Sequence, residues 1–205
     1  MRYIDLSHTL NNDTKVSPFD KEIVMKRVKF LEEDHFNDTE MTSTMHIGTH
    51  IDAPSHMLDS EINVSNIDIN RFIGKGVFLD FKNKKNIDLR EEDKLKIEEN
   101  SIVMIYTNMD KVIGSEEYYF NHPKISLELC NYLVEKKVKI VALDFYSPDS
   151  LPSTIHKILL KNNILIVENI KDAHLLKGLE DFTLYMMPIK IDAEGAMIRA
   201  FASVK

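Results

Sequence analysis

The chain has 205 residues, of which 43% are hydrophobic and 29% charged, and its formal net charge is −7 at neutral pH. This balance predicts one globular domain over residues 1–205 and excludes a disordered or collagen-like chain. The negative charge argues against nucleic acid as a partner, because nucleic-acid binding rewards clustered Lys and Arg.

The sequence also argues against secretion and against a membrane location. Its single cysteine, Cys130, cannot form an intrachain disulfide, which suits a reducing compartment. The N-terminus lacks an apolar stretch of signal-peptide length before its first charges. Apolar runs such as Ile164–Val167 are far shorter than the ~20 residues of a membrane helix. We therefore expect a cytoplasmic protein with no membrane partner.

Short strand-like runs dominate the chain and are rich in β-branched and aromatic residues. In chain order they are Tyr3–Leu6, Ile23–Phe30, Val77–Phe81, Ile102–Thr107, Ile140–Asp144, Ile164–Val167, Thr183–Ile189 and Met197–Ala202. A helix is predicted over Ser126–Lys136, where Ser126 can cap the first turn and apolar residues recur at helical spacing. A second helix is predicted over Ser153–Lys161. The fold class is therefore α/β, a single mixed domain with more strand than helix.

Four side chains able to bind metal or transfer protons lie within one short window: His46, His50, Asp52 and His56. Two imidazoles and a carboxylate are a normal ligand set for a catalytic zinc or a related divalent ion. Such a site leaves a coordination position for water, which the metal activates near neutral pH. Independent surface or core histidines are the alternative explanation, since the chain has 8 histidines. The density of the window favours a metal site.

The spacing of this window requires a bent backbone. Residues four apart in a flat strand lie ~13 Å from each other, too far for His46 and His50 to share an ion. Gly48, midway between them, is the residue best able to permit a bend. Pro54 disfavours a long regular helix. We expect a kinked loop or short turn at the edge of the sheet, with residues 32–38 forming a separate acidic surface loop.

The window His46-x-Gly48-Thr49-His50-x-Asp52-x-Pro54-x-His56 resembles the signature of the metal-dependent cyclase family. Bacterial kynurenine formamidases (arylformamidases) and isatin hydrolases belong to this family. The resemblance extends along the whole chain, with further matches at Ile4–His8, Phe72–Gly74, Val77–Asp80, Leu184–Lys190 and Ala196–Ala200. It implies the family's swivelling β/β/α fold and a homodimer or homotetramer.

A second cluster is implied by the same resemblance. The stretch Asp144-Phe-Tyr-Ser147-Pro-Asp149 resembles the family's Asp-x-x-Ser-x-Asp pattern, and His156 and Glu168 fall where the family carries further ligands. By resemblance, one ion would be held by His46, His50 and Asp52, and a second by Asp52, His156 and Glu168. Zinc is expected, with manganese as the alternative. His56 would be the general acid/base.

The chain departs from kynurenine formamidases at the substrate pocket. Relatives carry an aromatic residue, often tryptophan, in a Val-Trp-Pro-Gly-like stretch, where this chain has Val16-Ser17-Pro18-Phe19 and no tryptophan anywhere. We expect Ser17 and Phe19 to contact the substrate. The expected activity is hydrolysis of a small-molecule amide by metal-activated water, with N-formylkynurenine as the first candidate substrate. Alternatives are an isatin-like lactam, another amide or ester, or a family member that binds metal with little catalysis.

Overall fold

The computed structural model describes residues 1–204, and its dominant element is an eight-stranded mixed sheet. Its strands are β1 Arg2–Asp5, β4 His50–Asp52, β5 Ile73–Asp80, β7 Ile102–Tyr106, β9 Ile140–Leu143, β10 Leu165–Glu168, β11 Phe182–Pro188 and β12 Gly195–Val204. Two smaller strand pairs stand apart from it, β2 Val24–Lys29 with β3 Asp38–Thr42 and β6 Asn86–Ile87 with β8 Lys124–Ile125. None of the helices in the described range is long and apolar enough to cross a membrane.

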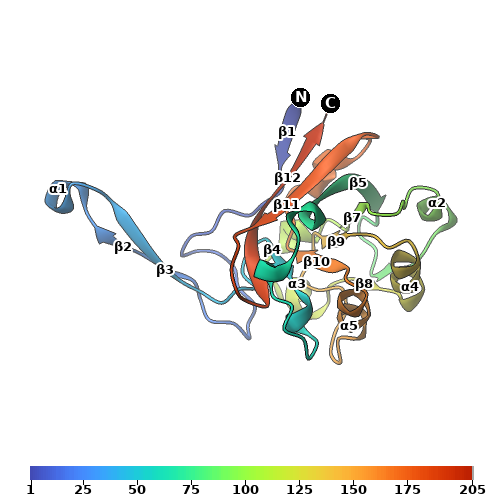
Figure 1. Cartoon of the computed structure of the whole chain (residues 1–205), viewed down its shortest axis with the longest axis horizontal. Coiled ribbons are helices and arrows are strands. Elements are labelled where there is room, and N and C mark those ends of the chain that lie inside the picture. Colours follow the sequence, from blue (N-terminus) through green and yellow to red (C-terminus); the bar gives the residue numbers. More distant parts are fainter. Residues whose placement is uncertain (205) are drawn as a thin grey trace.

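The large sheet closes on itself (Figure 1). Its strand order is β1-β12-β11-β5-β7-β9-β10-β4, and β4 also pairs with β12. Strands β5, β7, β9 and β10 run parallel, whereas β4 is antiparallel to both of its neighbours. The register places Glu168 of β10 opposite His50, and Gly195 of β12 opposite Asp52. Strand β4 is therefore the seam of a β-barrel.

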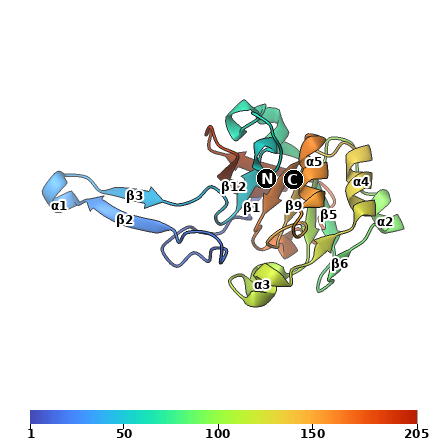
Figure 2. The same cartoon turned by 90° about the horizontal axis from the view of Figure 1, so that it is seen from below.

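The helices are short. They are α1 Leu31–Asp34, α2 Glu91–Lys94, α3 Glu116–Phe120, α4 Leu127–Glu135 and α5 Thr154–Lys161, with 3-10 turns η1 Pro54–His56, η2 Val64–Asn66, η3 Ile69–Phe72, η4 Met109–Val112 and η5 Ala173–Leu176. Helix α4 begins where predicted, because the Ser126 side chain accepts a hydrogen bond from the Leu129 N–H at 3.2 Å. Helices α4 and α5 lie side by side against the parallel strands (Figure 2).

Two apolar cores occupy the two faces of the sheet. Alternate residues of β7 show the division: Ile102 and Met104 belong to the core inside the barrel, and Val103 and Ile105 to the core beneath α4 and α5. Because both faces are covered, the parallel strands are continuous apolar runs instead of alternating ones. This packing makes the sheet a rigid support for the side chains at its strand ends.

Two local predictions were wrong. The segment from His46 to His56 was expected to be a kinked loop at the sheet edge, but it contains β4, which pairs on both sides within the closed sheet. Residues 32–38 were expected to form a surface loop, but they contribute to α1 and to the start of β3. At β4 the hydrogen bonds of two partner strands override a sequence of low strand propensity. At α1 the Asp34 carboxylate accepts a hydrogen bond from the Phe30 N–H at 2.9 Å, which closes a helical turn.

Strands β2 and β3 with α1 between them form a long hairpin that projects away from the barrel (Figure 1). We call residues Val24–Thr42 the arm. Every residue of β3 is exposed, as is every residue of β2 except Met25, which is half-buried. The arm returns to the barrel only four residues before His46, so it leads directly into the candidate site.

Candidate metal centre

Residues 46–56 run as a bend, a short strand and one helical turn. Gly48 has a φ of 57°, in the left-handed region that glycine adopts at little cost, and a Cβ there would lie 2.5 Å from Leu10 Cδ2. The bend brings the ring centroids of His46 and His50 to 5.1 Å. The turn at Pro54–His56 then places the His56 ring 4.0 Å from that of His46. The local backbone thus gathers three imidazoles.

Two more side chains reach the same place from distant parts of the chain. Glu168 ends β10 directly opposite His50, and His156 comes from the first turns of α5. The structure therefore brings together all the side chains predicted to bind metal or transfer protons, namely His46, His50, Asp52, His56, His156 and Glu168. The role of each side chain stays a prediction. Of these, His50, Asp52, His156 and Glu168 are buried.

Two of the imidazoles point their Nε2 atoms at the same pair of carboxylates. His50 Nε2 lies 3.4 Å from Glu168 Oε2 and 3.7 Å from Asp52 Oδ1. His156 Nε2 lies 3.3 Å from Glu168 Oε1 and 3.9 Å from Asp52 Oδ2. The opposite nitrogens are already engaged, since His50 Nδ1 bonds the Gly48 carbonyl at 2.9 Å and His156 Nδ1 bonds Asp149 at 2.6 Å. Outer oxygen partners of this kind orient histidines that ligate metals.

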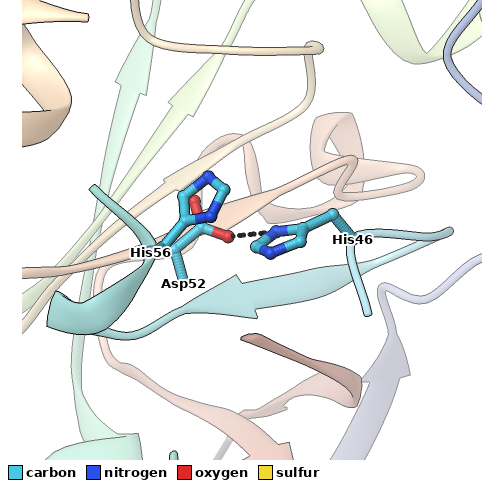
Figure 3. A group of neighbouring side chains, drawn as sticks. All are labelled: His46, Asp52 and His56. Atoms are coloured by element: carbon cyan, nitrogen blue, oxygen red, sulfur yellow. Dashed lines mark hydrogen bonds and ion pairs between the residues drawn. The ribbon is translucent and has the colours of Figure 1, made fainter. Parts of the chain in front are cut away.

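His46, Asp52 and His56 form a second group around the same carboxylate (Figure 3). His46 Nδ1 is hydrogen-bonded to Asp52 Oδ1 at 2.9 Å. Asp52 therefore presents one oxygen to His46 and His50 and the other to His156. A carboxylate shared between two groups of ligands must lie between them, and Asp52 does.

The donor set fits a divalent cation. Three of its atoms are buried without a hydrogen-bond partner, namely His46 Nε2, Asp52 Oδ2 and Glu168 Oε1. Unpaired polar atoms in an interior cost about 1–3 kcal/mol each. A cation would satisfy imidazole nitrogens and carboxylate oxygens together, and both are ligands of zinc and manganese. The residues present thus suit a divalent metal ion.

The charges within the cluster shift the protonation of its members. Burial opposes a charge on His46, but the hydrogen bond and charge of Asp52 outweigh burial and raise the pKa of His46 to about 9. Burial is likewise outweighed at His156, where Asp149 and Glu168 raise the pKa to about 10. At His56, burial dominates and lowers the pKa below its ordinary value of 6.5. Among these three histidines, His56 is the one held neutral near pH 7.

Three neighbours of the cluster were given no role by the sequence analysis: Asp149, Glu194 and Gly195. Asp149 accepts hydrogen bonds from His156 Nδ1 and from the Ile155 N–H at 2.5 Å, so it fixes the start of α5 and the ring together. Glu194 Oε1 lies 3.3 Å from His46 Nε2 without the geometry of a hydrogen bond. A Cβ at Gly195 would lie 2.6 Å from His46 Cε1. Of these three residues, only Asp149 could have been found from the sequence, because it ends the Asp-x-x-Ser-x-Asp pattern.

The cluster opens into a cavity of about 580 Å³. Ser17 lies buried in its wall, where its hydroxyl is 3.0 Å from the Tyr146 hydroxyl, and Phe19 stands at the mouth with 82% of its surface exposed. Tyr119 also lines the cavity, with its ring edge-on to Tyr146 at 5.3 Å. Aromatic surface is therefore present in the pocket although Ser17 offers none.

Buried imidazoles and carboxylates that converge at the ends of rigid strands, beside an open pocket, define the class of metal-dependent hydrolases. The family model described as "Putative cyclase" matches residues 4–150. This chain belongs to that cyclase family.

Relatives of known name agree with this assignment. The chain is 28% identical to a kynurenine formamidase of Bacillus anthracis, over 97% of this chain and 96% of that protein. It is 29% identical to a kynurenine formamidase of Bacillus thuringiensis subsp. konkukian, over 97% and 95%. Among solved structures, isatin hydrolase A from Labrenzia aggregata, bound to benzyl benzoate, has a TM-score of 0.85 at 21% identity, covering 99% of this chain and 93% of that one. These likenesses bear out the predicted family and the strand-rich α/β fold.

Proposed function

We propose that this chain is a metal-dependent amidohydrolase that cleaves the C–N bond of a small aryl formamide, with N-formylkynurenine as the first candidate substrate. The observation that carries the proposal is the convergence of the Nε2 atoms of His50 and His156 on two buried carboxylates. The kynurenine formamidases that align with almost the whole chain support the choice of substrate class.

The proposed ligands form two groups that share Asp52. His46 and His50 would hold one ion with one Asp52 oxygen, while His156 and Glu168 would hold a second with the other oxygen. The 2.9 Å and 3.9 Å separations of the two Asp52 oxygens from His46 and His156 support this division. We propose zinc, with manganese as the alternative, because both accept mixed imidazole and carboxylate ligands. Bound there, the ion supplies Lewis acidity, which lowers the pKa of a coordinated water and stabilises charge on a carbonyl oxygen.

His56 is the proposed general acid/base. Its lowered pKa leaves the imidazole neutral near pH 7, so a ring nitrogen can accept a proton from the attacking water. The resulting imidazolium can then donate that proton to the leaving nitrogen, which completes cleavage of the amide. Its position 4.0 Å from the His46 ring keeps it beside the proposed ligands and inside the cavity.

The pocket would bind the substrate through Ser17 and Phe19, with Tyr119 and Tyr146 as aromatic walls. A cavity of about 580 Å³ lined in this way also suits a bicyclic lactam, which makes isatin-like substrates the second candidate. The single cysteine, Cys130, is buried and unpaired, which supports the proposed cytoplasmic location.

Elemental analysis and turnover of N-formylkynurenine, measured on one purified sample, test this proposal. Bound zinc or manganese with release of formate is the expected result. If the protein binds metal but turns over isatin and not N-formylkynurenine, the proposed substrate changes from a formamide to a lactam. Absence of metal after reconstitution would refute the metal centre.

A His56→Ala variant tests the proton-transfer role separately. Turnover should fall by about 10²–10⁴-fold, the usual contribution of a general acid/base, while metal content stays unchanged. His174→Ala, which removes a more exposed histidine outside the cavity, is the matched control and should keep full activity. Loss of metal in the His56 variant would reassign this residue as a ligand.

A further inference from the structure

The backbone carbonyl of Gly48 is the outer partner of the His50 imidazole. His50 Nδ1 lies 2.9 Å from this oxygen, and because a carbonyl can only accept, Nδ1 carries the proton and Nε2 keeps its lone pair. That lone pair is on the side of the ring that faces the carboxylates of Asp52 and Glu168. The orientation of one peptide group therefore determines how the His50 ring is presented.

A glycine is the residue least able to hold its own carbonyl in one direction. Gly48 has a φ of 57°, and without a Cβ its backbone torsions have more accessible states than those of any other residue. The bend that brings the rings of His46 and His50 to 5.1 Å thus depends on a flexible position. The carbonyl that follows this bend needs a partner from another part of the chain.

Asn169 supplies this partner from the end of β10. Its Nδ2 donates a hydrogen bond to the Gly48 carbonyl at 2.9 Å, and its backbone carbonyl accepts one from the Thr49 hydroxyl at 2.8 Å. Asn169 Nδ2 also lies 3.5 Å from His50 Nδ1, because both donors converge on the same oxygen, which has two lone pairs. Asn169 therefore holds the chain on both sides of the peptide bond between Gly48 and Thr49.

The backbone conformation of Asn169 suits this task. Its φ of 58° lies in the left-handed region, which asparagine adopts more readily than most residues. Asn169 is buried and directly follows Glu168, the last residue of β10. One strand end thus provides a proposed metal ligand and, in the next residue, the support of a second proposed ligand on β4.

Tyr118 determines which end of the Asn169 amide faces Gly48. The Tyr118 hydroxyl lies 2.5 Å from Asn169 Oδ1, and it donates because burial holds the pKa of Tyr118 well above its usual range. A flipped amide would place Oδ1 against the Gly48 carbonyl, which is also an acceptor. Tyr118 itself is fixed, since it is fully buried on α3. Only one orientation of the Asn169 amide therefore satisfies both of its neighbours.

We propose that Asn169, held by Tyr118, is a positioning residue that orients His50 for the metal ion through the Gly48 carbonyl. Asn169 acts through the backbone and the imidazole and does not touch the ion. This inference rests on the proposed metal centre, whereas the hold of Asn169 on the His50 ring does not. The alternative is a structural role, in which these bonds stabilise the pairing of β10 with β4 and leave metal affinity unaffected.

Zinc affinity, measured by competition with a chromophoric chelator, separates these two roles. Asn169→Gly removes the amide and keeps the backbone, because glycine adopts a φ of 58° at little cost. We expect zinc affinity to fall by about 10–100-fold, the usual effect of losing the outer support of a ligand. The thermal midpoint of the zinc-free chain is measured on the same sample. A lower midpoint with native zinc affinity would establish the structural role and overturn the proposal.

Tyr118→Phe is the milder change, because it removes one hydroxyl and keeps the ring. Tyr106→Phe is the matched control: the Tyr106 hydroxyl also bonds an asparagine Oδ1, that of Asn108 at 2.9 Å, and neither residue lines the metal cavity. Zinc affinity should fall in Tyr118→Phe and stay native in Tyr106→Phe. Added to Asn169→Gly, Tyr118→Phe should cause no further loss, since both changes break one connection. Equal zinc affinity in the two tyrosine variants, or fully additive losses, would contradict the proposal.

The imidazole proton of His50 gives a readout that needs neither metal nor turnover. A proton on Nδ1 that is held by the Gly48 carbonyl should exchange slowly with water in nitrogen-resolved NMR spectra of the zinc-free chain. We expect slow exchange in the native chain and in Tyr106→Phe, and faster exchange in Asn169→Gly and Tyr118→Phe. This pattern in a chain that binds no zinc would refute the metal centre and keep the hold on His50. The same exchange rate in every variant would refute that hold, even in an enzyme that cleaves formamides.

Discussion

Gly195 should control metal affinity through its contact with His46. A methyl group at this position would lie 2.6 Å from Cε1 and 2.9 Å from Nε2 of the His46 ring. Because carbon atoms pack at about 3.5 Å, the ring would have to retreat by about 1 Å. Such a movement breaks the 2.9 Å bond between His46 Nδ1 and Asp52. Gly195 lies outside the proposed ligands and supports the His46 ring from behind, and loss of such outer support typically lowers metal affinity by about 10–100-fold, equivalent to about 1.4–2.7 kcal/mol.

Competition with a chromophoric chelator measures this effect on Gly195→Ala. The matched control is Gly74→Ala on β5, where the added methyl group meets Ile102 at 3.1 Å in the core and no proposed ligand. We expect the control to lower thermal stability without changing zinc affinity, and Gly195→Ala to weaken zinc binding. Equal zinc affinity in Gly195→Ala and the native chain would refute the argument that this glycine is required by the His46 ring.

Three further predictions follow from the site. Asp149→Asn should weaken zinc binding by about 10–100-fold in the same chelator assay, because His156 loses its charged partner. Since the pKa values of His46 and His156 are raised to about 9 and about 10, both hold protons at pH 7 that a metal must displace. Zinc affinity should therefore rise from pH 7 to pH 9, and calorimetry should show proton release to the buffer; a buffer-independent heat would contradict this. Tyr146→Ala should raise the KM for an aryl formamide by roughly two- to twelve-fold with unchanged metal content, while Tyr146→Phe keeps the ring and the native KM.

The elements that the sequence predicted correctly are those whose signal is local. The apolar run from Ile102 is a strand because it is buried on both faces, and helix α4 begins at Ser126 because that side chain caps it. The bend at Gly48 was likewise predicted, since only a residue without a Cβ fits a φ of 57° next to Leu10. In each case the conformation is determined by residues within one turn or one strand, so the sequence alone is enough to predict it.

What the sequence could not predict depends on pairing between distant segments. Strand β4 has only three residues, and its partners on β10 and β12 are more than a hundred positions away. Glu194 and Gly195 carry no local signal of function; they matter because the pairing of Gly195, the first residue of β12, with Asp52 places both of them beside His46. Their roles could not be predicted without knowing that the sheet closes, since long-range register is not specified by local propensity.

The same closure explains why metal binding and folding should be coupled. Strand β4 joins β10 to β12, and in doing so it buries Asp52 and Glu168 close to each other. Two buried carboxylates repel, and the imidazoles of His46 and His156 offset this only while protonated. Above their raised pKa values that compensation is lost, and a divalent ion becomes the remaining source of positive charge at the seam. A ligand that binds only the folded state stabilises it by mass action, so the metal should stabilise the closed barrel most strongly at alkaline pH.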